Sequence, residues 1–500
     1  MDTLLDIAGG RHRHRHGDDT NPIAGALNEQ RPDAGGLTAE ALTADERLKE
    51  AFDDFGANGG VRSPADNQAA RQQIEKAKAS NEPFRTLVLD GGGIHGLAQV
   101  KALAELERRT GKPIADQFDL MVGTSTGGLI ALALATPHPD DPNRSLMTAQ
   151  ELVDFYEEEG PKIFGTRNRR DSGADWDEKP LEDFLKSKFG DMRMSDTRIP
   201  VMVSAYDADN AEAVWLRDLG PAYCRECDAD PLLWQAARAT SAAPTKFKPV
   251  AVDMGEGQEP RTRNLIDGGV FANMPALEAY VVAQGMAQDI GGGRPVEMLS
   301  IGTGVERVTM SADKVSRTGA LGWAINFFDR FSPIREVAEQ GKESSADKLL
   351  KAKLGDRYHR WNIPLKHSEG KKFSPSGDID DASAGNLEKI SMVADEFIYD
   401  NSEQIDRMAD SLEPNRADVS PPPEKQSREE LQARLDEADP PSPGLLARIF
   451  GWGSKKSTML ASGPKSVEQL KSSTSEMAIT ASMEPPKPDA LEPPKRSMAS

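Results

Sequence analysis

Residues 120–128 read Leu-Met-Val-Gly-Thr-Ser-Thr-Gly-Gly, an apolar run that passes directly into a glycine-rich turn. The turn fits the pattern Gly-x-Ser-x-Gly with residues Gly123, Thr124, Ser125, Thr126 and Gly127. A strand, this turn and a helix of small residues form a nucleophile elbow, which pushes the serine outward while the glycines relieve crowding. The pattern also arises by chance in a chain with 43 glycines, but its context favours Ser125 as a nucleophile.

A second glycine-rich turn, Asp90-Gly91-Gly92-Gly93-Ile94-His95-Gly96, follows the apolar run at residues 86–89. Glycines allow backbone N–H groups to approach a ligand closely at the start of a helix, as in a phosphate loop or an oxyanion hole. A Walker loop is excluded because no Gly-Lys-Ser/Thr follows, and the match to the dinucleotide fingerprint is weak on its own. With a serine nucleophile elsewhere in the chain, an oxyanion hole is the better interpretation.

A serine nucleophile needs a base, because its hydroxyl is weakly nucleophilic alone. A third turn, Asp267-Gly268-Gly269, follows the strand expected at residues 264–266 and places a carboxylate at a strand end. A Ser–Asp dyad is therefore predicted, although Asp-Gly-Gly by itself is more often a simple turn. A triad through His359 or His367 is the alternative, but both lie among charged residues and are expected at the surface.

Between residues 84 and 407, short apolar runs alternate with helical patterns, which is typical of βαβ units around a parallel sheet. Strands are predicted at residues 85–89, 120–122, 201–206, 264–266 and 296–301. Helices are predicted at residues 97–109, 129–135, 149–159, 181–189, 232–240 and 276–284.

Together the three turns resemble the patatin-like phospholipase family, in the family's order. The resemblance extends over roughly residues 84–407 and includes three further segments, Ala239-Thr240-Ser241-Ala242-Ala243-Pro244, Ser300-Ile301-Gly302-Thr303-Gly304 and Asp380-Asp381-Ala382-Ser383. It differs at His95, where the family more often has Arg or Lys. His95 would make any anion contact at that position pH-dependent.

The resemblance implies an α/β three-layer sandwich with a mostly parallel central sheet. It implies that Ser125 is the nucleophile, that Asp267 is the general base, and that backbone amides of Gly91, Gly92 and Gly93 form the oxyanion hole. The implied reaction is hydrolysis of phospholipid or other lipid esters without a metal or cofactor. An esterase for neutral or soluble esters, an effector that a ligand or partner activates, and a non-catalytic scaffold are the alternatives.

The chain has 500 residues, of which 37% are hydrophobic and 6% aromatic, low values for a fully globular protein. Residues 1–80 are polar, with weak helical patterns at residues 37–55 and 65–79. Residues 401–500 hold 13 of the 34 prolines, a density that burial cannot offset against ordering entropy. We therefore expect a partly helical N-terminal extension (1–80), one catalytic domain (81–407) and a largely disordered tail (408–500).

The net charge of −20 argues against a protein that neutralises nucleic-acid phosphates. Cys224 and Cys227 cannot form a disulfide framework or a complete zinc site. The N-terminus lacks the apolar run of a secretory signal, and no stretch reaches the 18 or more apolar residues of a membrane span. The expected location is cytoplasmic, and peripheral membrane contact or export as an effector stays open.

Two segments are candidates for contact with a membrane. Leu321–Phe331 carries a nearly helical apolar stripe, which also suits an ordinary core helix. Gly444–Lys456 is an apolar, aromatic and basic island in a stretch whose net charge is +3 over residues 441–500, from 8 basic and 5 acidic residues; it could equally bind a partner protein. The Arg-His repeat at Arg11–His16 is more typical of a solvated run than of a metal site.

Overall fold

The structure is a computed structural model of the chain. It describes residues 82–165, 174–218, 230–254, 262–289, 292–304, 315–316, 333–417 and 424–438. All of these belong to one compact unit, Met1–Pro440. The predicted N-terminal helical patterns, Arg11–His16, the two cysteines, Leu321–Phe331 and Gly444–Lys456 lie outside the described residues.

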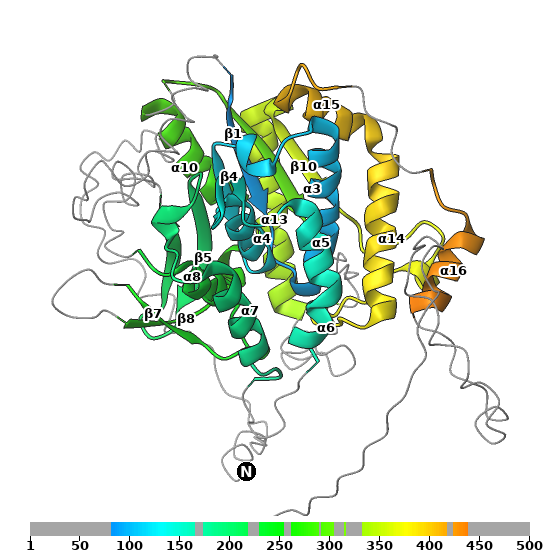
Figure 1. Ribbon diagram of the computed structural model, residues 1–500, viewed down its shortest axis with the longest axis horizontal. Coiled ribbons are helices and arrows are strands. Elements are labelled where there is room, and N and C mark those ends of the chain that lie inside the picture. Colours follow the sequence, from blue (N-terminus) through cyan, green and yellow to red (C-terminus); the bar gives the residue numbers. More distant parts are fainter. Residues whose placement is uncertain are drawn as a thin grey trace, which may run out of the picture. The chain divides into compact units, whose positions relative to one another are not determined.

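A central sheet of eight strands organises the described residues (Figure 1). Its strand order is β10-β9-β1-β2-β5-β8-β7, and β6 pairs with β5. The first part of this order is parallel and contains β10 (Tyr358–Asn362), β9 (Val296–Gly302), β1 (Phe84–Leu89), β2 (Leu120–Gly123) and β5 (Val201–Asp207). The carboxyl ends of these strands, where ligands bind in such sheets, lie along one edge.

The antiparallel part of the sheet is built around β5. On one side, β6 (Glu212–Asp218) pairs with β5 along its whole length. On the other side, β2 pairs with residues 201–203 of β5 and β8 (Thr262–Asp267) pairs with residues 205–207 in the opposite direction. The ends of β2 and β8 therefore point toward each other along the same edge of β5. Strand β7 (Val250–Asp253) extends the sheet beyond β8.

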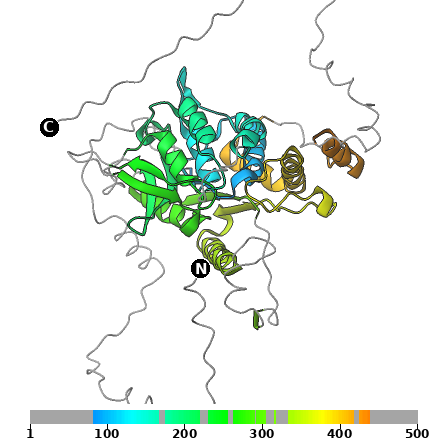
Figure 2. The same ribbon diagram turned by 90° about the horizontal axis from the view of Figure 1, so that it is seen from below.

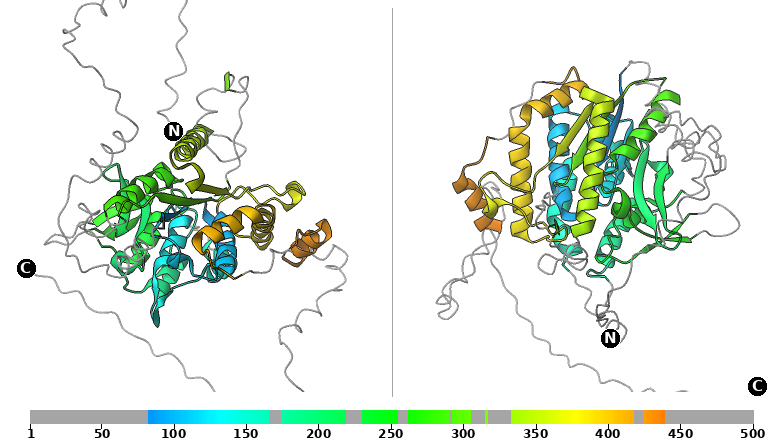
Figure 3. Two further views of the ribbon diagram at one scale, coloured as in Figure 1. Left: turned by 90° about the horizontal axis from the view of Figure 1, so that it is seen from above. Right: turned by 180° about the vertical axis from the view of Figure 1, so that it is seen from behind.

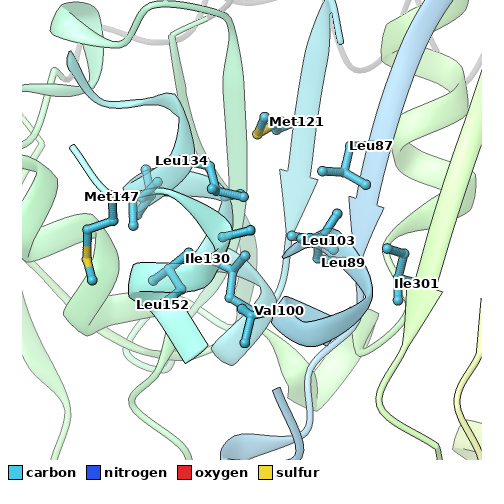
Figure 4. Close-up of a cluster of buried hydrophobic side chains, with 14 of the residues drawn as sticks. Leu87, Leu89, Val100, Leu103, Met121, Ile130, Leu134, Met147, Leu152 and Ile301 are labelled. Atoms are coloured by element: carbon cyan, nitrogen blue, oxygen red, sulfur yellow. The ribbon is translucent and has the colours of Figure 1, made fainter. Parts of the chain in front are cut away.

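Helices cover one face of the sheet with an apolar core. Alternate residues of β1, Leu87 and Leu89, point into this core, as expected for the period of two in a strand. Figure 4 shows them beside side chains of the covering helices. The helices that contribute include α3 (Gly96–Thr110), α4 (Thr126–Ala135), α5 (Ala149–Glu158), α7 (Lys179–Phe189), α8 (Leu233–Thr240) and α14 (Ala384–Asp400).

The opposite face has its own core. Phe84 and Val88, the other alternate residues of β1, pack there with side chains of α10 (Ala276–Asp289) and α13 (Pro333–Leu354). Figure 2 shows the yellow-green α13 across the sheet from the cyan helices, and Figure 3 shows the same helix from behind. Helices on both faces of a mostly parallel sheet form the predicted three-layer α/β sandwich.

Each strand and helix predicted between residues 84 and 407 is present, with ends that differ by a few residues. The sequence patterns did not predict the long and largely buried helix α14. The other unpredicted elements are short, polar or half exposed. Strand β7 alternates buried and exposed residues, for example, and gives a weak pattern in four residues. The others are β3 (Pro137–His138), β4 (Asp141–Ser145), β6, β10, α6 (Gly160–Ile163), α9 (Gly269–Ala272), α13, and the 3-10 helices η1 (Gly93–His95), η2 (Ile114–Asp116), η3 (Met194–Asp196), η4 (Gly355–Arg357) and η5 (Lys371–Phe373).

Ordered structure continues past residue 407, where the sequence placed the end of the domain. Helix α15 (Ser402–Leu412) and helix α16 (Arg428–Ala438) follow α14. Leu431 of α16 is buried with Phe373 and Met392 in a small apolar cluster, so a few apolar residues anchor an otherwise charged helix. The expected tail at 408–500 therefore begins too early.

Within the described ranges, none of the helices combines the length and the apolar character that crossing a membrane requires.

Candidate active site

Ser125 sits at the sharp turn between β2 and α4. Its backbone has φ 55° and ψ −125°, a strained conformation for a residue with a side chain. A Cβ atom on Gly123 would lie 2.3 Å from the carbonyl oxygen of Gly127, and one on Gly127 would lie 2.3 Å from that of Leu89. The turn is therefore possible only with glycine on both sides of the serine, which explains the predicted pattern.

The ends of β2 and β8 point toward each other along β5, which explains how Ser125 comes close to Asp267, 142 positions later in the chain. Gly123 pairs with Val203 and Asp267 pairs with Ala205, so one residue of β5, Ser204, separates the two ends. The Ser204 hydroxyl donates to the Thr124 hydroxyl at 2.7 Å. This arrangement brings the turn after β2 and the carboxylate at the end of β8 together.

The Ser125 side chain faces the Asp267 carboxylate and favours its ionised form, which lowers the pKa of that carboxyl. The Gly269 amide donates to Asp267 Oδ1 at 2.7 Å and fixes the carboxylate. Asp267 is 4% exposed, and this burial raises the pKa of the carboxyl to about 7, against the lowering effects of Ser125 and of the Gly269 hydrogen bond. A carboxylate with such a pKa can take a proton from a hydroxyl more readily than an exposed aspartate can.

Two hydrogen bonds that sequence reasoning missed hold the elbow. The Ser125 amide donates to the Thr240 hydroxyl at 2.9 Å, and the Thr124 hydroxyl donates to the Ala272 carbonyl at 2.7 Å. Thr240 lies in the segment 239–244 that carries the family resemblance, which was the available signal for it. These contacts stabilise the strained backbone of the turn from both neighbouring segments.

The glycine loop at 91–93 lies beside the elbow, and it corrects one expectation. The Gly91 amide donates to the Asn273 carbonyl at 2.9 Å, so it is not available to a substrate. The amides of Gly92 and Gly93 have no hydrogen-bond acceptor among the described residues. The Thr303 hydroxyl, just after β9, donates to the Gly91 carbonyl at 2.7 Å and holds the loop in place. Two of the three predicted amides are thus free to bind an anion.

A buried ion pair lies behind the glycine loop. Arg360 donates to Asp90 Oδ2 at 2.5 Å and to the Ser300 hydroxyl at 2.8 Å, and both charged side chains are nearly inaccessible to solvent. Burial raises the pKa of Asp90 while the charge of Arg360 lowers it, with a net increase. This pair ties the start of the loop to β9 and β10, and the sequence motifs do not reveal Arg360 as its partner.

The histidines do not join Ser125. His359 on β10 has its Nε2 3.3 Å from Oε1 of Glu297 on β9, and His367 Nδ1 lies 3.6 Å from Glu396. His367 is buried, in contrast to the expected surface position. His95 is buried as well, and its Nε2 lies 2.8 Å from the Ser376 carbonyl rather than toward an anion site. The predicted triad alternative thus finds no support in the geometry.

The described residues contain no cluster of three or more His, Cys, Asp or Glu side chains arranged to hold a metal ion.

An apolar pocket opens beside the half-buried Ser125 and encloses about 620 Å³ including its open mouth. Its wall is mostly aliphatic and aromatic, with polar groups at Ser125, Ser241, Lys246 and Asp380. The apolar residues are Ile94, Leu129, Phe155, Ile163, Phe164, Leu181, Phe247 and Ile379. A lining of this composition suits a hydrocarbon chain whose polar end lies at the serine.

Comparisons with known proteins agree with this site. A family model described as patatin-like phospholipase matches residues 87–280. Patatin-1-Kuras 2 from Solanum tuberosum is 30% identical over 338 residues, which cover 63% of this chain and 87% of that protein. Patatin-like protein 2 from Oryza sativa subsp. indica is 29% identical over 350 residues, which cover 64% of this chain and 85% of that protein.

A solved structure, the crystal structure of VipD from Legionella pneumophila, aligns with 63% of this chain and 67% of that chain at 12% identity. Its TM-score of 0.25 is too low to bear on the fold. The identity to the plant patatins and the matched family model decide the relationship. The chain belongs to the patatin-like phospholipase family, a family of lipid acyl hydrolases.

Proposed function

We propose that the protein hydrolyses carboxylic ester bonds of phospholipids, as a phospholipase A or lysophospholipase, through a Ser125–Asp267 dyad. The observation that carries this proposal is the placement of Ser125, which lines the apolar pocket, against the buried Asp267 carboxylate. The pocket accepts the acyl chain, and the ester carbonyl lies between Ser125 Oγ and the glycine loop.

In the first step, Asp267 takes the proton from Ser125 as Oγ attacks the ester carbonyl carbon. The carbonyl oxygen becomes an oxyanion and accepts hydrogen bonds from the free amides of Gly92 and Gly93. When the tetrahedral intermediate collapses, the bond from carbon to the alcohol oxygen breaks, and Asp267 returns the proton to the leaving alcohol. The acyl group remains on Ser125 as an ester.

In the second step, water attacks the acyl-enzyme. Asp267 takes a proton from this water, the Gly92 and Gly93 amides again hold the oxyanion, and the fatty acid leaves as Ser125 Oγ regains the proton. Such preorganised backbone donors are effective because they need no reorientation during the reaction, and each contributes about 10²–10³ in rate in other serine hydrolases.

The activity is assigned to residues 81–407 together with the helices that follow up to Ala438. The extensions then have no direct part in the chemistry. A protein with a net charge of −20 is repelled by an anionic membrane surface. We therefore propose peripheral contact through Leu321–Phe331 or Gly444–Lys456, whose apolar and basic residues would oppose this repulsion.

The test is incubation of purified protein with a panel of defined phospholipids, lysophospholipids and triglycerides, with released fatty acid and lysolipid measured by mass spectrometry. Ser125→Ala should abolish release. Ser241→Ala is the matched control, because Ser241 lines the same pocket but donates its hydroxyl to the Ala237 carbonyl; it should retain activity.

Release from phospholipids by wild type and Ser241→Ala but not by Ser125→Ala supports the proposal. Release from neutral esters alone would replace it with an esterase of the same mechanism. Undiminished release by Ser125→Ala would overturn the assigned nucleophile.

A further inference from the structure

A short strap, residues 374–383, crosses from the glycine loop to the far wall of the acyl pocket. At the loop, the Ile94 amide donates to the Ile379 carbonyl at 2.8 Å. A Cβ atom on Gly93 would lie 2.1 Å from that carbonyl, so the strap and the loop are in close contact. Farther along, His95 Nε2 donates to the Ser376 carbonyl at 2.8 Å. Backbone carbonyls on one side of the strap are therefore hydrogen-bonded to the glycine loop.

The other side of the strap is anchored by the side chain of Asp380. Its Oδ2 accepts hydrogen bonds from Trp176 Nε1 at 2.8 Å and from Lys246 Nζ at 2.7 Å. The carboxyl is 13% exposed. Burial opposes its charge, but the hydrogen bonds and the charge of Lys246 outweigh burial, and the pKa of Asp380 is lowered. Asp380 therefore stays ionised and bound at neutral pH.

Asp380 is linked through Trp176 to the aromatic wall of the pocket, which is formed by Phe164 and Phe247. The ring of Trp176 packs edge-on against Phe164, with ring centres 5.9 Å apart, and Phe164 lies 6.0 Å from Phe247. Phe164, Phe247, Lys246, Ile379 and Asp380 all line the pocket. The Trp176 amide also donates to the Lys246 carbonyl at 3.0 Å, so both donors to Asp380 belong to one rigid unit.

From these contacts we propose that Asp380 determines acyl-chain selectivity, by holding Ile379 as one wall of the pocket at a fixed distance from the aromatic wall. The proposal rests on the proposed acyl hydrolase function and names an additional residue for its specificity. Asp380 acts through the strap and has no part in the chemical steps. The strap meets the glycine loop at Ile379 and the aromatic wall through Asp380, so a long acyl chain contacts this side of the pocket over more of its length than a short one does.

The role of Asp380 can be tested by substitution, because Lys246 has a second acidic partner. Lys246 also pairs with Asp175 at 3.2 Å, so removal of Asp380 does not leave a lysine without an anionic partner. Asp380→Ala should therefore fold and release the strap at one side while the backbone bond from Ile94 to Ile379 remains. Asp380→Asn retains an acceptor for Trp176 and Lys246 and should have a weaker effect. Asp378→Ala changes an exposed acid of the same strap and is the matched control.

The experiment measures kcat and KM of the full-length protein for monomeric p-nitrophenyl acetate, butyrate, octanoate and decanoate. Loss of apolar contact for roughly two methylene groups predicts about a tenfold fall in the decanoate-to-butyrate ratio of kcat/KM for Asp380→Ala. The fall should arise in KM, with butyrate turnover within about twofold of wild type. Trp176→Phe, which removes one donor and keeps an aromatic ring, should shift the ratio in the same direction.

An unchanged ratio in Asp380→Ala and Trp176→Phe would overturn the proposal. An equal loss for every ester would also overturn it, because that result indicates a general effect on the oxyanion loop or on folding. Failure of the wild type to hydrolyse any ester would instead refute the proposed function. If Asp380→Ala does not fold by circular dichroism, the ratios of Asp380→Asn and Trp176→Phe decide in the same way.

Discussion

Lowering the pH should switch the enzyme off through Asp267. In the proposed mechanism the dyad works only when this carboxylate is ionised, because only then can it take the proton of Ser125. Burial raises the pKa of Asp267 from 3.8 to about 7, so protonation begins close to neutral pH rather than in acid. A dyad with an ordinary, exposed aspartate would stay active to a pH about three units lower.

The size of the effect follows from the titration of a single group. One unit below the pKa, about one molecule in ten has an ionised Asp267, so kcat/KM should fall about tenfold between roughly pH 8 and pH 6 and about another tenfold by pH 5. Above about pH 8 the rate should reach a plateau, because the carboxylate is then fully ionised.

The assay is kcat/KM for p-nitrophenyl butyrate across this range, at constant ionic strength. Two other titratable groups could produce a similar loss of activity at low pH. Glu343 has a pKa raised to about 6, mainly by desolvation, and accepts a hydrogen bond from the Asn273 side chain. Burial lowers the pKa of His95, against the opposing effect of its hydrogen bond to Ser376 and of nearby acids.

Glu343→Gln and His95→Gln are therefore the controls. In both variants the midpoint of the decrease in kcat/KM should stay near pH 7, whatever their level of activity. A midpoint near pH 4 in the wild type would refute the raised pKa. A decrease that disappears in His95→Gln would assign the titration to the histidine and refute the role of Asp267.

Three further predictions concern the stability and geometry of the same site. Asp267→Asn should have a higher free energy of unfolding than wild type at about pH 8, because an ionised buried carboxylate opposes folding above its raised pKa. The difference between the two free energies should shrink by about 3 kcal/mol toward pH 5, where the wild-type carboxyl is protonated. Urea unfolding at both pH values measures it. Thr240→Val leaves the Ser125 amide without its acceptor and should cost about 1–3 kcal/mol of stability with a loss of kcat, while Thr240→Ser should retain most of both; equal behaviour of the two variants in thermal melts and kinetics would contradict this role. Gly92→Ala would place a Cβ atom 2.2 Å from the Thr303 hydroxyl, so the loop must move and kcat should fall about 10²–10³-fold; a kcat near wild type would exclude Gly92 as an oxyanion donor.

The local features of the site were predictable from the sequence. The elbow at Ser125 is a pattern of neighbouring residues in which a Cβ on Gly123 would meet backbone atoms of the same turn, although a Cβ on Gly127 would meet the Leu89 carbonyl at the end of β1. The same holds for Asp267 and Gly269, whose hydrogen bond spans two residues. The alternation of apolar runs likewise predicted β1, β2, β5, β8 and β9 but not β10, and the layer order was implied by the family resemblance. Such features depend on short-range sterics and on burial periodicity, which the sequence expresses directly.

The features that escaped prediction depend on contacts between distant segments. The Gly91 amide is occupied because Asn273 lies opposite it, a consequence of how β8 and α9 meet the loop. The pairing of Asp90 with Arg360 depends on the position of β10 beside β9. Short-range patterns do not encode strand register, so a motif can identify a glycine loop without showing which of its amides are free.

The most direct measurement of whether Ser125 and Asp267 form the dyad is covalent trapping. Full-length protein is treated with a long-chain fluorophosphonate, and the modified residue is located by peptide mass spectrometry. The expected result is one adduct, on Ser125, formed at least a hundredfold more slowly in Asp267→Asn than in wild type. An adduct on a different serine such as Ser241, or labelling of Ser125 at an unchanged rate in Asp267→Asn, would contradict the dyad.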